Sequence, residues 1–280
     1  MTGLELAPIV FGLSSAACWG AADFCGGLAT KRTQVYRVII SSQVVSLILL
    51  LALAFLTREA SLPIDRLLLG YVAGMFGAIG LIALYRALAD SHMGVAAPVS
   101  AVVAAAMPVV FGVFLEGFPG MAQLIGFGLA FIAVWLISRT SHARVHWRDL
   151  GLPFLAGLGF GIFFVIIGSI GQSAVWWPLV AARLGSLSLL LGMTLIKRQA
   201  QVVAKPLIAI AVIIGVLEVG GNACYILARQ AGRLDVAAVL ASLYPATTVL
   251  LVRFVLKEHV GRSQLVGIVA ALAAIILITL

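Results

Sequence analysis

The chain has 280 residues, of which 63% are hydrophobic and only 10% are Asp, Glu, Lys or Arg, and its mean hydropathy is +1.18. Soluble domains carry about 25% charged residues, so this composition excludes a soluble enzyme or binding module. The net charge of +8 does not indicate nucleic-acid binding, because the basic residues occur one to three at a time between apolar segments. We therefore expect a polytopic protein whose main partner is the lipid bilayer.

Apolar segments of about the length of a membrane-spanning helix follow one another along the whole chain. The first segment lacks the basic start and the short apolar core of a cleaved signal peptide, so we expect it to be retained as a helix. The sequence thus predicts an all-α fold with ten transmembrane helices. In chain order they are residues 6–29, 35–56, 67–89, 94–115, 121–138, 151–171, 176–196, 206–228, 234–255 and 262–279.

The two halves of the chain resemble each other when the sequence is shifted on itself by 141 residues. Glycine matches are common in membrane helices, so the constant offset, not any single match, indicates a repeat. Residues 1–140 and 151–280 are therefore predicted to be two five-helix repeats, joined by a basic linker at 141–150. The shift superposes Gly20 on Gly161, Gly74 on Gly215, Gly80 on Gly221, and Gln123-Leu124-x-Gly126 on Gln264-Leu265-x-Gly267.

Each predicted repeat holds five helices, an odd number, so the second repeat must enter the membrane in the opposite direction to the first. Inverted repeats of transporters place the substrate site near the membrane midplane, at the interface between the repeats. Connectors that follow odd-numbered helices carry thirteen Lys and Arg residues, whereas those that follow even-numbered helices carry four. By the positive-inside rule, we expect the odd connectors in the cytoplasm and both termini outside the cell.

Three charged side chains lie more than one turn from either end of a predicted helix: Asp23 in the first, Arg183 in the seventh and Glu218 in the eighth. An ionisable group at membrane depth is costly unless it is paired or hydrated, so each is a candidate for function. Arg183 and Glu218 can pair with each other as a buried lock. Alternatively, Arg183 binds the carboxylate of a substrate, and Glu218 binds its ammonium group or a coupling proton. For Asp23, in the last turns of its helix, we expect a solvated or helix-end role.

The eighth segment carries a polar stripe, because Asn222 follows Glu218 by about one helical turn and Tyr225 lies further along. Trp19 and Phe160 are mates in the repeat, and each directly precedes a matched glycine. For any single aromatic residue, packing against lipid or core is the alternative to a binding role. The aromatic residues at the expected depth of a cavity are Trp19, Tyr85, Phe160, Phe163, Phe164, Tyr225 and Tyr244.

Proline interrupts two of the predicted helices. Pro98 and Pro108 lie in the fourth, and Pro245 lies in the ninth, the mate of the fourth in the repeat. A proline inside a helix removes a backbone hydrogen bond and tends to kink it. We therefore predict that these two helices are kinked and act as gates.

Motifs of catalysis and of metal binding are absent from the sequence. No HExxH or GxSxG motif and no paired intramembrane Asp or His supports a membrane-embedded enzyme. The three cysteines, Cys18, Cys25 and Cys224, lack CxxC spacing and a His partner at ligand spacing. We expect no enzyme activity, no metal and no other cofactor. A channel or structural subunit is the alternative to a carrier. Flux through it would not saturate.

Several motifs occupy fixed places along the predicted helices. They are Trp19-Gly20-Ala21-Ala22-Asp23-Phe24 in the first, Tyr244-Pro245 in the ninth, and Lys257-Glu258 before the Gln264-Leu265-x-Gly267 of the tenth. Together with the ten helices in two repeats, this pattern resembles the EamA branch of the drug/metabolite transporter superfamily over the whole chain. In length and aromatic content, the chain is most similar to the YddG-like exporters of aromatic and other neutral amino acids.

This resemblance implies a central cavity lined by helices 1, 3, 4, 6, 8 and 9, with helices 5 and 10 at the periphery. Members with both termini in the cytoplasm occur in this branch, and we retain the opposite, charge-based orientation for this chain. We therefore expect a monomeric transporter in the inner membrane that exports small apolar metabolites, first of all amino acids. A broad drug or metabolite exporter is the alternative. The resemblance implies these lining residues: Trp19, Tyr85, Phe160, Phe163, Glu218, Asn222, Tyr225 and Tyr244.

Overall fold

A computed structural model describes residues 3–30, 33–89, 93–138, 150–196, 208–255, 257 and 261–278. These residues contain α-helices and no strand, so the predicted all-α class is confirmed for the described part of the chain. The helices are α1 (Gly3–Thr30), α2 (Val35–Leu56), α3 (Ile64–Ala89), α4 (Met93–Glu116), α5 (Met121–Ser138), α6 (Gly151–Ile170), α7 (Trp176–Ile196), α8 (Ile208–Ala231), α9 (Leu234–Ala241), α10 (Tyr244–Val255) and α11 (Arg262–Ile278).

Eight helical segments within the described residues are long and apolar enough to cross a membrane, so the chain is a multi-pass membrane protein. One of these segments, Leu234–Val255, consists of α9 and α10 together. Two further apolar helices, α5 and α11, are shorter. The 17 residues of α11 extend about 26 Å, a little less than the ~30 Å of a typical hydrocarbon core. The predicted total of ten spans therefore depends on these two helices.

The ninth predicted helix is broken in its middle. α9 ends at Ala241, α10 begins at Tyr244, and Ser242 and Leu243 form a turn between them. Pro245 explains the break, because it has no N–H to donate to the carbonyl of Ala241 four residues earlier, whereas proline is tolerated in the first turn of α10. The Ser242 hydroxyl donates to the carbonyl of Val239 at 2.7 Å and so satisfies one group near the break.

The fourth helix behaves differently from its mate. α4 is continuous through Pro98 and Pro108, so the predicted interruption does not break this helix. Ala104 stands at the position that corresponds to Pro245, 141 residues earlier. The first repeat therefore lacks the proline that breaks the second. The side chain of Pro98 lies outside the described part of the chain.

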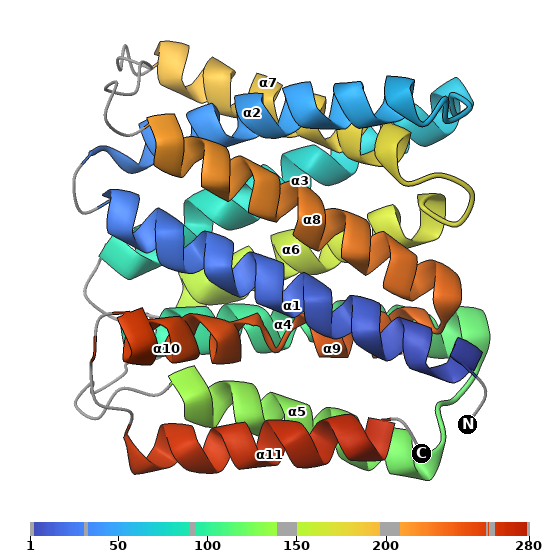
Figure 1. Ribbon diagram of the computed structural model, residues 1–280, viewed down its shortest axis with the longest axis vertical. Coiled ribbons are helices and arrows are strands. Elements are labelled where there is room, and N and C mark those ends of the chain that lie inside the picture. The colour runs from blue at the N-terminus through green and yellow to red at the C-terminus, as the bar shows by residue number, and fades with distance from the viewer. Residues whose placement is uncertain are drawn as a thin grey trace.

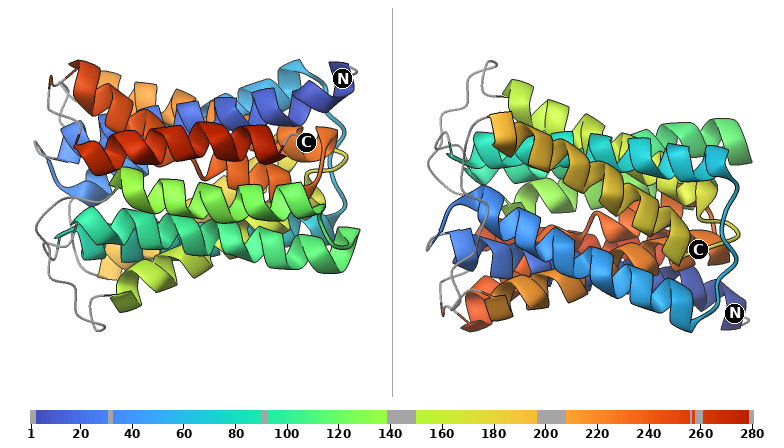
Figure 2. Two further views of the ribbon diagram at one scale, coloured as in Figure 1. Left: turned by 90° about the horizontal axis from the view of Figure 1, so that it is seen from below. Right: turned by 90° about the horizontal axis from the view of Figure 1, so that it is seen from above.

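The helices run side by side along the bundle (Figure 1, Figure 2). Each helix of one repeat makes the same contacts as the corresponding helix of the other repeat. α1 packs along α8 as α6 packs along α3, and α4 packs on α6 as α9 and α10 pack on α1. The mates α2 and α7 contact each other, and α5 and α11 pair at one edge of the bundle. These are the contacts expected of two similar repeats related by a two-fold axis.

The matched glycines lie at equivalent helix crossings. A Cβ atom added at Gly80 of α3 would press against the Phe160 ring of α6, and one added at Gly221 of α8 would press against the Trp19 indole of α1. Phe160 and Trp19 are themselves mates at the same 141-residue offset. Small residues let helix backbones approach closely in membranes. Close packing matters there because the hydrophobic effect does not drive helices together in lipid. The repeat thus preserves the positions at which the halves meet.

We predict that Gly74→Ala lowers the thermal unfolding midpoint of the detergent-solubilised protein. An added Cβ at Gly74 would overlap the backbone carbonyl of Ala182 on α7, and a backbone group has no alternative rotamer. Overpacking of this kind costs on the order of 1–3 kcal/mol. The control is Gly128→Ala on α5, where nothing lies within 4 Å of an added Cβ. Equal midpoints for the two variants would contradict the close crossing of α3 and α7.

Candidate functional site

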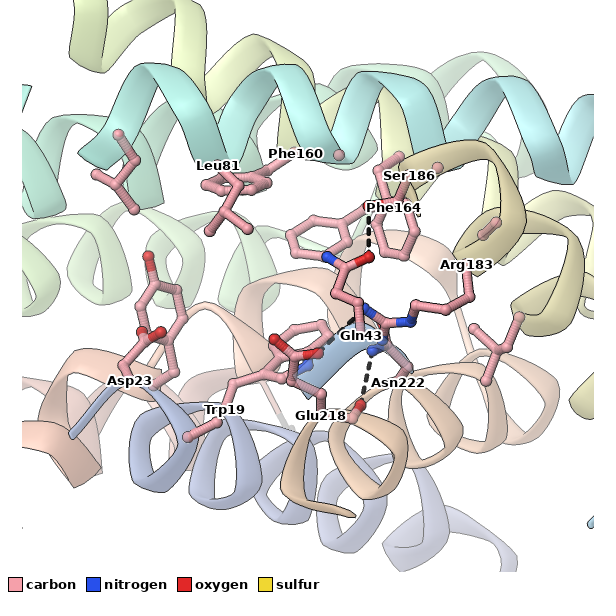
Figure 3. Close-up of a pocket in the computed structure, with 18 residues that line it drawn as sticks. Trp19, Asp23, Gln43, Leu81, Phe160, Phe164, Arg183, Ser186, Glu218 and Asn222 are labelled. Atoms are coloured by element: carbon pink, nitrogen blue, oxygen red, sulfur yellow. Dashed lines mark hydrogen bonds and ion pairs between the residues drawn. The ribbon is translucent and has the colours of Figure 1, made fainter. Parts of the chain in front are cut away.

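A cavity of about 170 Å³ lies between helices of both repeats (Figure 3). The first repeat contributes α1, α2 and α3 to its wall, and the second contributes α6, α7, α8 and α10. Helices α5 and α11 supply no lining residue among those described, as the family resemblance implies. The lining departs from that expectation at three helices, because α2 and α7 line the cavity whereas no described residue of α4 does.

Aromatic side chains of α1 and α6 form one part of the wall. The Trp19 indole stacks on Phe164, with ring centroids 5.2 Å apart and planes inclined by 16°. Phe163 meets Phe164 edge-on at 5.7 Å. Phe160 lies one helical turn before Phe164 and also lines the cavity. The aromatic repeat mates Trp19 and Phe160 therefore share one cavity.

Tyr225 lies behind this wall and does not line the cavity. Its side chain is fully buried, and its hydroxyl donates to the backbone carbonyl of Phe164 at 2.9 Å. Its ring lies 5.1 Å from Phe164 and 6.0 Å from Trp19. The expectation that Tyr225 contacts substrate is corrected, because its one polar group is bonded to the α6 backbone. Tyr225 instead holds the two aromatic residues that face the cavity.

Arg183 and Glu218 form an ion pair across α7 and α8. Their Nη1 and Oε2 atoms are 3.0 Å apart, and the side chains are 11% and 21% exposed. The same Oε2 accepts from the Ser46 hydroxyl of α2 at 3.4 Å. The Asn222 amide donates to the backbone carbonyl of Glu218 at 2.6 Å. Of the two arrangements that the sequence allows, the pair is the one present in this conformation.

Gln43 and Ser186 belong to the wall although the sequence did not single them out. The Ser186 hydroxyl donates to Oε1 of Gln43 at 2.6 Å, and both side chains are buried. The available signal was the amide itself, since Gln43 is the most polar residue of the long apolar run from Val38 to Leu56. Its significance was missed because the resemblance assigns no lining role to the second helix.

Asp23 also lines the cavity, and this is a further departure from the sequence analysis (Figure 3). It follows Trp19 by about one turn on α1, so both side chains lie on one helix face. Its side chain is exposed. Among the described residues, no hydrogen bond or ion pair joins the Asp23 carboxylate to another side chain. The structure therefore places Asp23 on the cavity wall, and the expected solvated or helix-end role stays a prediction.

The other predicted site residues are distributed as follows. Pro108 is buried in α4 away from the cavity lining, and Pro245 directly follows the lining residue Tyr244. The side chain of Tyr85 lies outside the described residues. The residues that the sequence analysis proposed for binding and that lie on the cavity wall are Trp19, Phe160, Phe163, Arg183, Glu218, Asn222 and Tyr244.

An ionic cluster joins the two repeats at the end of the bundle that carries the even-numbered connectors. Glu116, the last residue of α4, pairs with Arg229 of α8 at 2.7 Å and lies 3.9 Å from Arg233. Arg233 pairs in turn with the fully buried Asp235 at 2.8 Å. The hydrogen bond to Asp235 raises the pKa of Arg233, which therefore stays charged at any physiological pH.

A second contact between the repeats lies at the same end. The Glu59 carboxylate, in the connector between α2 and α3, accepts from the backbone N–H groups of Val175, Trp176 and Trp177 at 2.7, 2.9 and 2.9 Å. A carboxylate at a helix N-terminus satisfies donors that have no partner within the helix and interacts favourably with the helix dipole. The indole N–H of Trp177 donates to the Glu59 carbonyl at 2.9 Å. The first repeat thus caps a helix of the second.

We predict that Arg183→Met destabilises the purified protein, on the order of 3 kcal/mol, because Glu218 then keeps a partly buried charge without its partner. The double variant Arg183→Met/Glu218→Gln should regain part of that loss, since no unpaired charge is left. The measurement is the unfolding midpoint of both variants and of Glu218→Gln in one detergent. Leu184→Met, an exposed neighbour on α7, is the control. Strictly additive effects would contradict an energetically coupled pair.

Known proteins share this architecture. The EamA-like transporter family matches the chain twice, over residues 6–139 and over residues 149–280. A solved structure described as "Crystal structure of protein" is similar to the chain with a TM-score of 0.79, over 96% of this chain and 95% of the other, at 14% identity. At this identity the likeness supports the fold alone. No curated protein matches the sequence.

Proposed function

The chain belongs to the EamA-like transporter family, and we propose that it is a secondary transporter that exports small apolar metabolites, first of all aromatic and other neutral amino acids. The observation that carries this proposal is the cavity between the repeats, which combines aromatic walls with a few polar and ionisable groups. Binding sites for small molecules typically have this composition, with apolar walls for affinity and few polar groups for orientation.

The proposed topology has ten transmembrane helices in two inverted repeats. α5 and α11 pair with each other along the bundle, which favours two further spans of slightly short length. Five passes in the first repeat reverse the direction in which the second repeat enters. The Lys and Arg distribution then assigns the odd connectors to the cytoplasm and both termini to the outside of the inner membrane.

Transport proceeds by alternating access, in which one repeat rocks against the other around the cavity. The ionic cluster of Glu116, Arg229, Arg233 and Asp235 and the cap made by Glu59 both cross from the first repeat to the second. These contacts close the even-connector end in the present conformation and must separate when that end opens. In the proposed orientation this is the outer end, so the conformation is suited to loading from the cytoplasm.

A broad exporter of drugs or other metabolites is the alternative proposal, because an apolar cavity accepts many apolar molecules. The two differ in selectivity. Competition by a panel of neutral amino acids at similar concentrations supports the first proposal, whereas competition by structurally unrelated apolar compounds alone supports the second.

We predict saturable uptake of labelled phenylalanine or methionine into proteoliposomes that contain the purified protein, and counterflow when unlabelled substrate is enclosed. A carrier saturates because each cycle occupies one cavity. The assay is run with and without a pH gradient to determine coupling. Empty liposomes are the control. Flux that rises linearly with concentration would indicate a channel, and the absence of flux for every neutral amino acid would overturn the proposed substrate class.

We predict that Glu116→Gln opens the even-connector end more often. The neutral amide loses its ion pair with Arg229, so the closed conformation loses stability relative to the open one. The background replaces Cys18, Cys25 and Cys224 by serine and places one cysteine at Ala22 on the cavity wall. Labelling by a membrane-impermeant maleimide, added on the even-connector side, should be several times faster in the variant.

The matched control for this experiment is Arg66→Gln. Arg66 is an exposed residue in the first turn of α3 at the same end of the bundle, outside the ionic cluster. Its replacement removes one charge without touching a contact between the repeats, and labelling should stay at the background rate. Equal labelling rates in the Glu116→Gln variant and its background would show that the cluster does not hold this end closed.

A further inference from the structure

We infer that Asp23 binds a positively charged amino group of the substrate, so that the site selects amines and organic cations with an aromatic or apolar body over acids. This inference rests on the proposed transport function and names the group that the cavity recognises. It differs from the expectation that Glu218 binds the ammonium group and Arg183 binds a carboxylate.

The cavity wall holds two carboxylates and one guanidinium, Asp23, Glu218 and Arg183. The guanidinium already pairs with Glu218 at 3.0 Å, so these two groups neutralise each other. A substrate carboxylate would have to compete with Glu218 for Arg183. Once the pair is set aside, Asp23 is the acidic group left on the wall, and its ionised form gives the wall one net negative charge. A ligand with one positive charge is the electrostatic complement of such a site.

Asp23 is accessible to a ligand and lacks a partner of opposite charge. Its side chain is exposed on the cavity wall, and the charged group near enough to affect it is Glu218, which has the same sign. Within the described ranges, no cation pairs with Asp23. An unpaired charge at membrane depth is unfavourable, and an ammonium group supplies both the missing charge and hydrogen-bond donors. Substrate binding therefore removes a cost that the free protein carries.

The cavity has a polar face and an apolar face (Figure 3). Asp23, Glu218 and Asn222 line it from α1 and α8, whereas Leu81 and Phe164 line it from α3 and α6. A ligand held between these faces must itself be amphiphilic. Its charged group would meet Asp23 and its apolar body would pack on the phenyl rings.

Trp19 adds a second recognition element beside Asp23. Its indole lies about one turn before Asp23 on α1, lines the cavity and is held by stacking on Phe164. Aromatic faces attract ammonium groups, most strongly when the site excludes water, and an indole is the best of them. A carboxylate next to an ordered indole is a combination that suits a primary or substituted amine. An acid would meet repulsion at the same place.

The test compares three ligands that share a phenyl ring and differ in charge. They are 2-phenylethylamine, which is a cation, phenylalanine, which is a zwitterion, and 3-phenylpropionate, which is an anion. Affinity is obtained from the rise of the unfolding midpoint of the purified protein in detergent with ligand concentration, because stabilisation follows RT ln(1 + [L]/Kd). We expect the amine to bind at least as tightly as phenylalanine and the acid to bind most weakly. Equal or tighter binding of the acid, or no binding of the amine, overturns the inference.

The variant Asp23→Asn tests the residue itself. Loss of a charge-assisted hydrogen bond should weaken amine binding roughly tenfold or more, while Asp65→Asn, an exposed residue in the first turn of α3, should leave it unchanged. Asp23→Glu retains the charge and should retain the preference for the amine over the acid. Should the asparagine variant fail to fold, the order of the three ligands on the native protein and on Asp23→Glu still decides. Unchanged amine affinity in Asp23→Asn overturns the inference.

The outcomes separate this inference from the proposed function, because binding is measured without transport. Amine binding that depends on Asp23, with no flux of any neutral amino acid, would retain the inference and overturn the proposed substrate. Saturable phenylalanine flux that the amine fails to inhibit would retain the transporter and overturn the inference.

Discussion

The structure is governed by the need of every polar group within the bundle to find a partner inside the protein, because hydrocarbon offers none. Serine hydroxyls on α2 meet this need by donating to carbonyls one turn earlier, as Ser42 does to Ile39 and Ser46 does to Ser42. Arg183 meets it with Glu218, and Gln43 with Ser186. Because each of these longer contacts joins two helices, satisfying the polar groups also fixes how the helices are placed.

Close helix approach makes these partnerships possible. Ser15 donates to the carbonyl of Gly221 across α1 and α8, and Ser46 donates to the carbonyl of Gly215 across α2 and α8. A short serine side chain reaches the carbonyl of a neighbouring helix where the two backbones lie close together, as they do at Gly215 and Gly221. The glycines at the 141-residue offset therefore serve both packing and hydrogen bonding. This explains why the repeat is visible in glycines while most other positions have diverged.

Much of the fold follows from the sequence alone. Apolar length located the helices, and the constant offset identified two similar halves, which the double match to one family supports. These features depend on local composition and spacing, which a single sequence contains. The break at Ser242 and Leu243 was anticipated as a kink, because proline acts through its own backbone. α4 stays helical through Pro98 and Pro108, and the kinks expected at these two residues stay predictions.

The site was only partly predictable, because the direction of a side chain depends on the helix that it meets. Tyr225 lies on the same stripe as Glu218, yet its hydroxyl reaches the backbone of α6 and never enters the cavity. Gln43 and Asp23 line the cavity although the sequence did not predict a lining role for either residue. Asp23 lies in the last turns of the first helix, and Gln43 lies in a helix with no expected lining role. Neither position indicates that the neighbouring helices leave a cavity beside the side chain. Such information is tertiary and appears only when the bundle is assembled.

The divergence between the repeats explains how one symmetric scaffold produces an asymmetric site. Several lining positions are mates at the 141-residue offset, yet one member is polar and the other is apolar: Asp23 with Phe164, Glu218 with Gly77, and Asn222 with Leu81. Because α1 and α8 cross in the same way as α6 and α3, the symmetry brings these mates to opposite faces of one cavity. Substitution on one face alone then makes the cavity amphiphilic without disturbing the crossings. In this way the glycines keep the repeats alike, while the lining residues of the proposed substrate site differ between them.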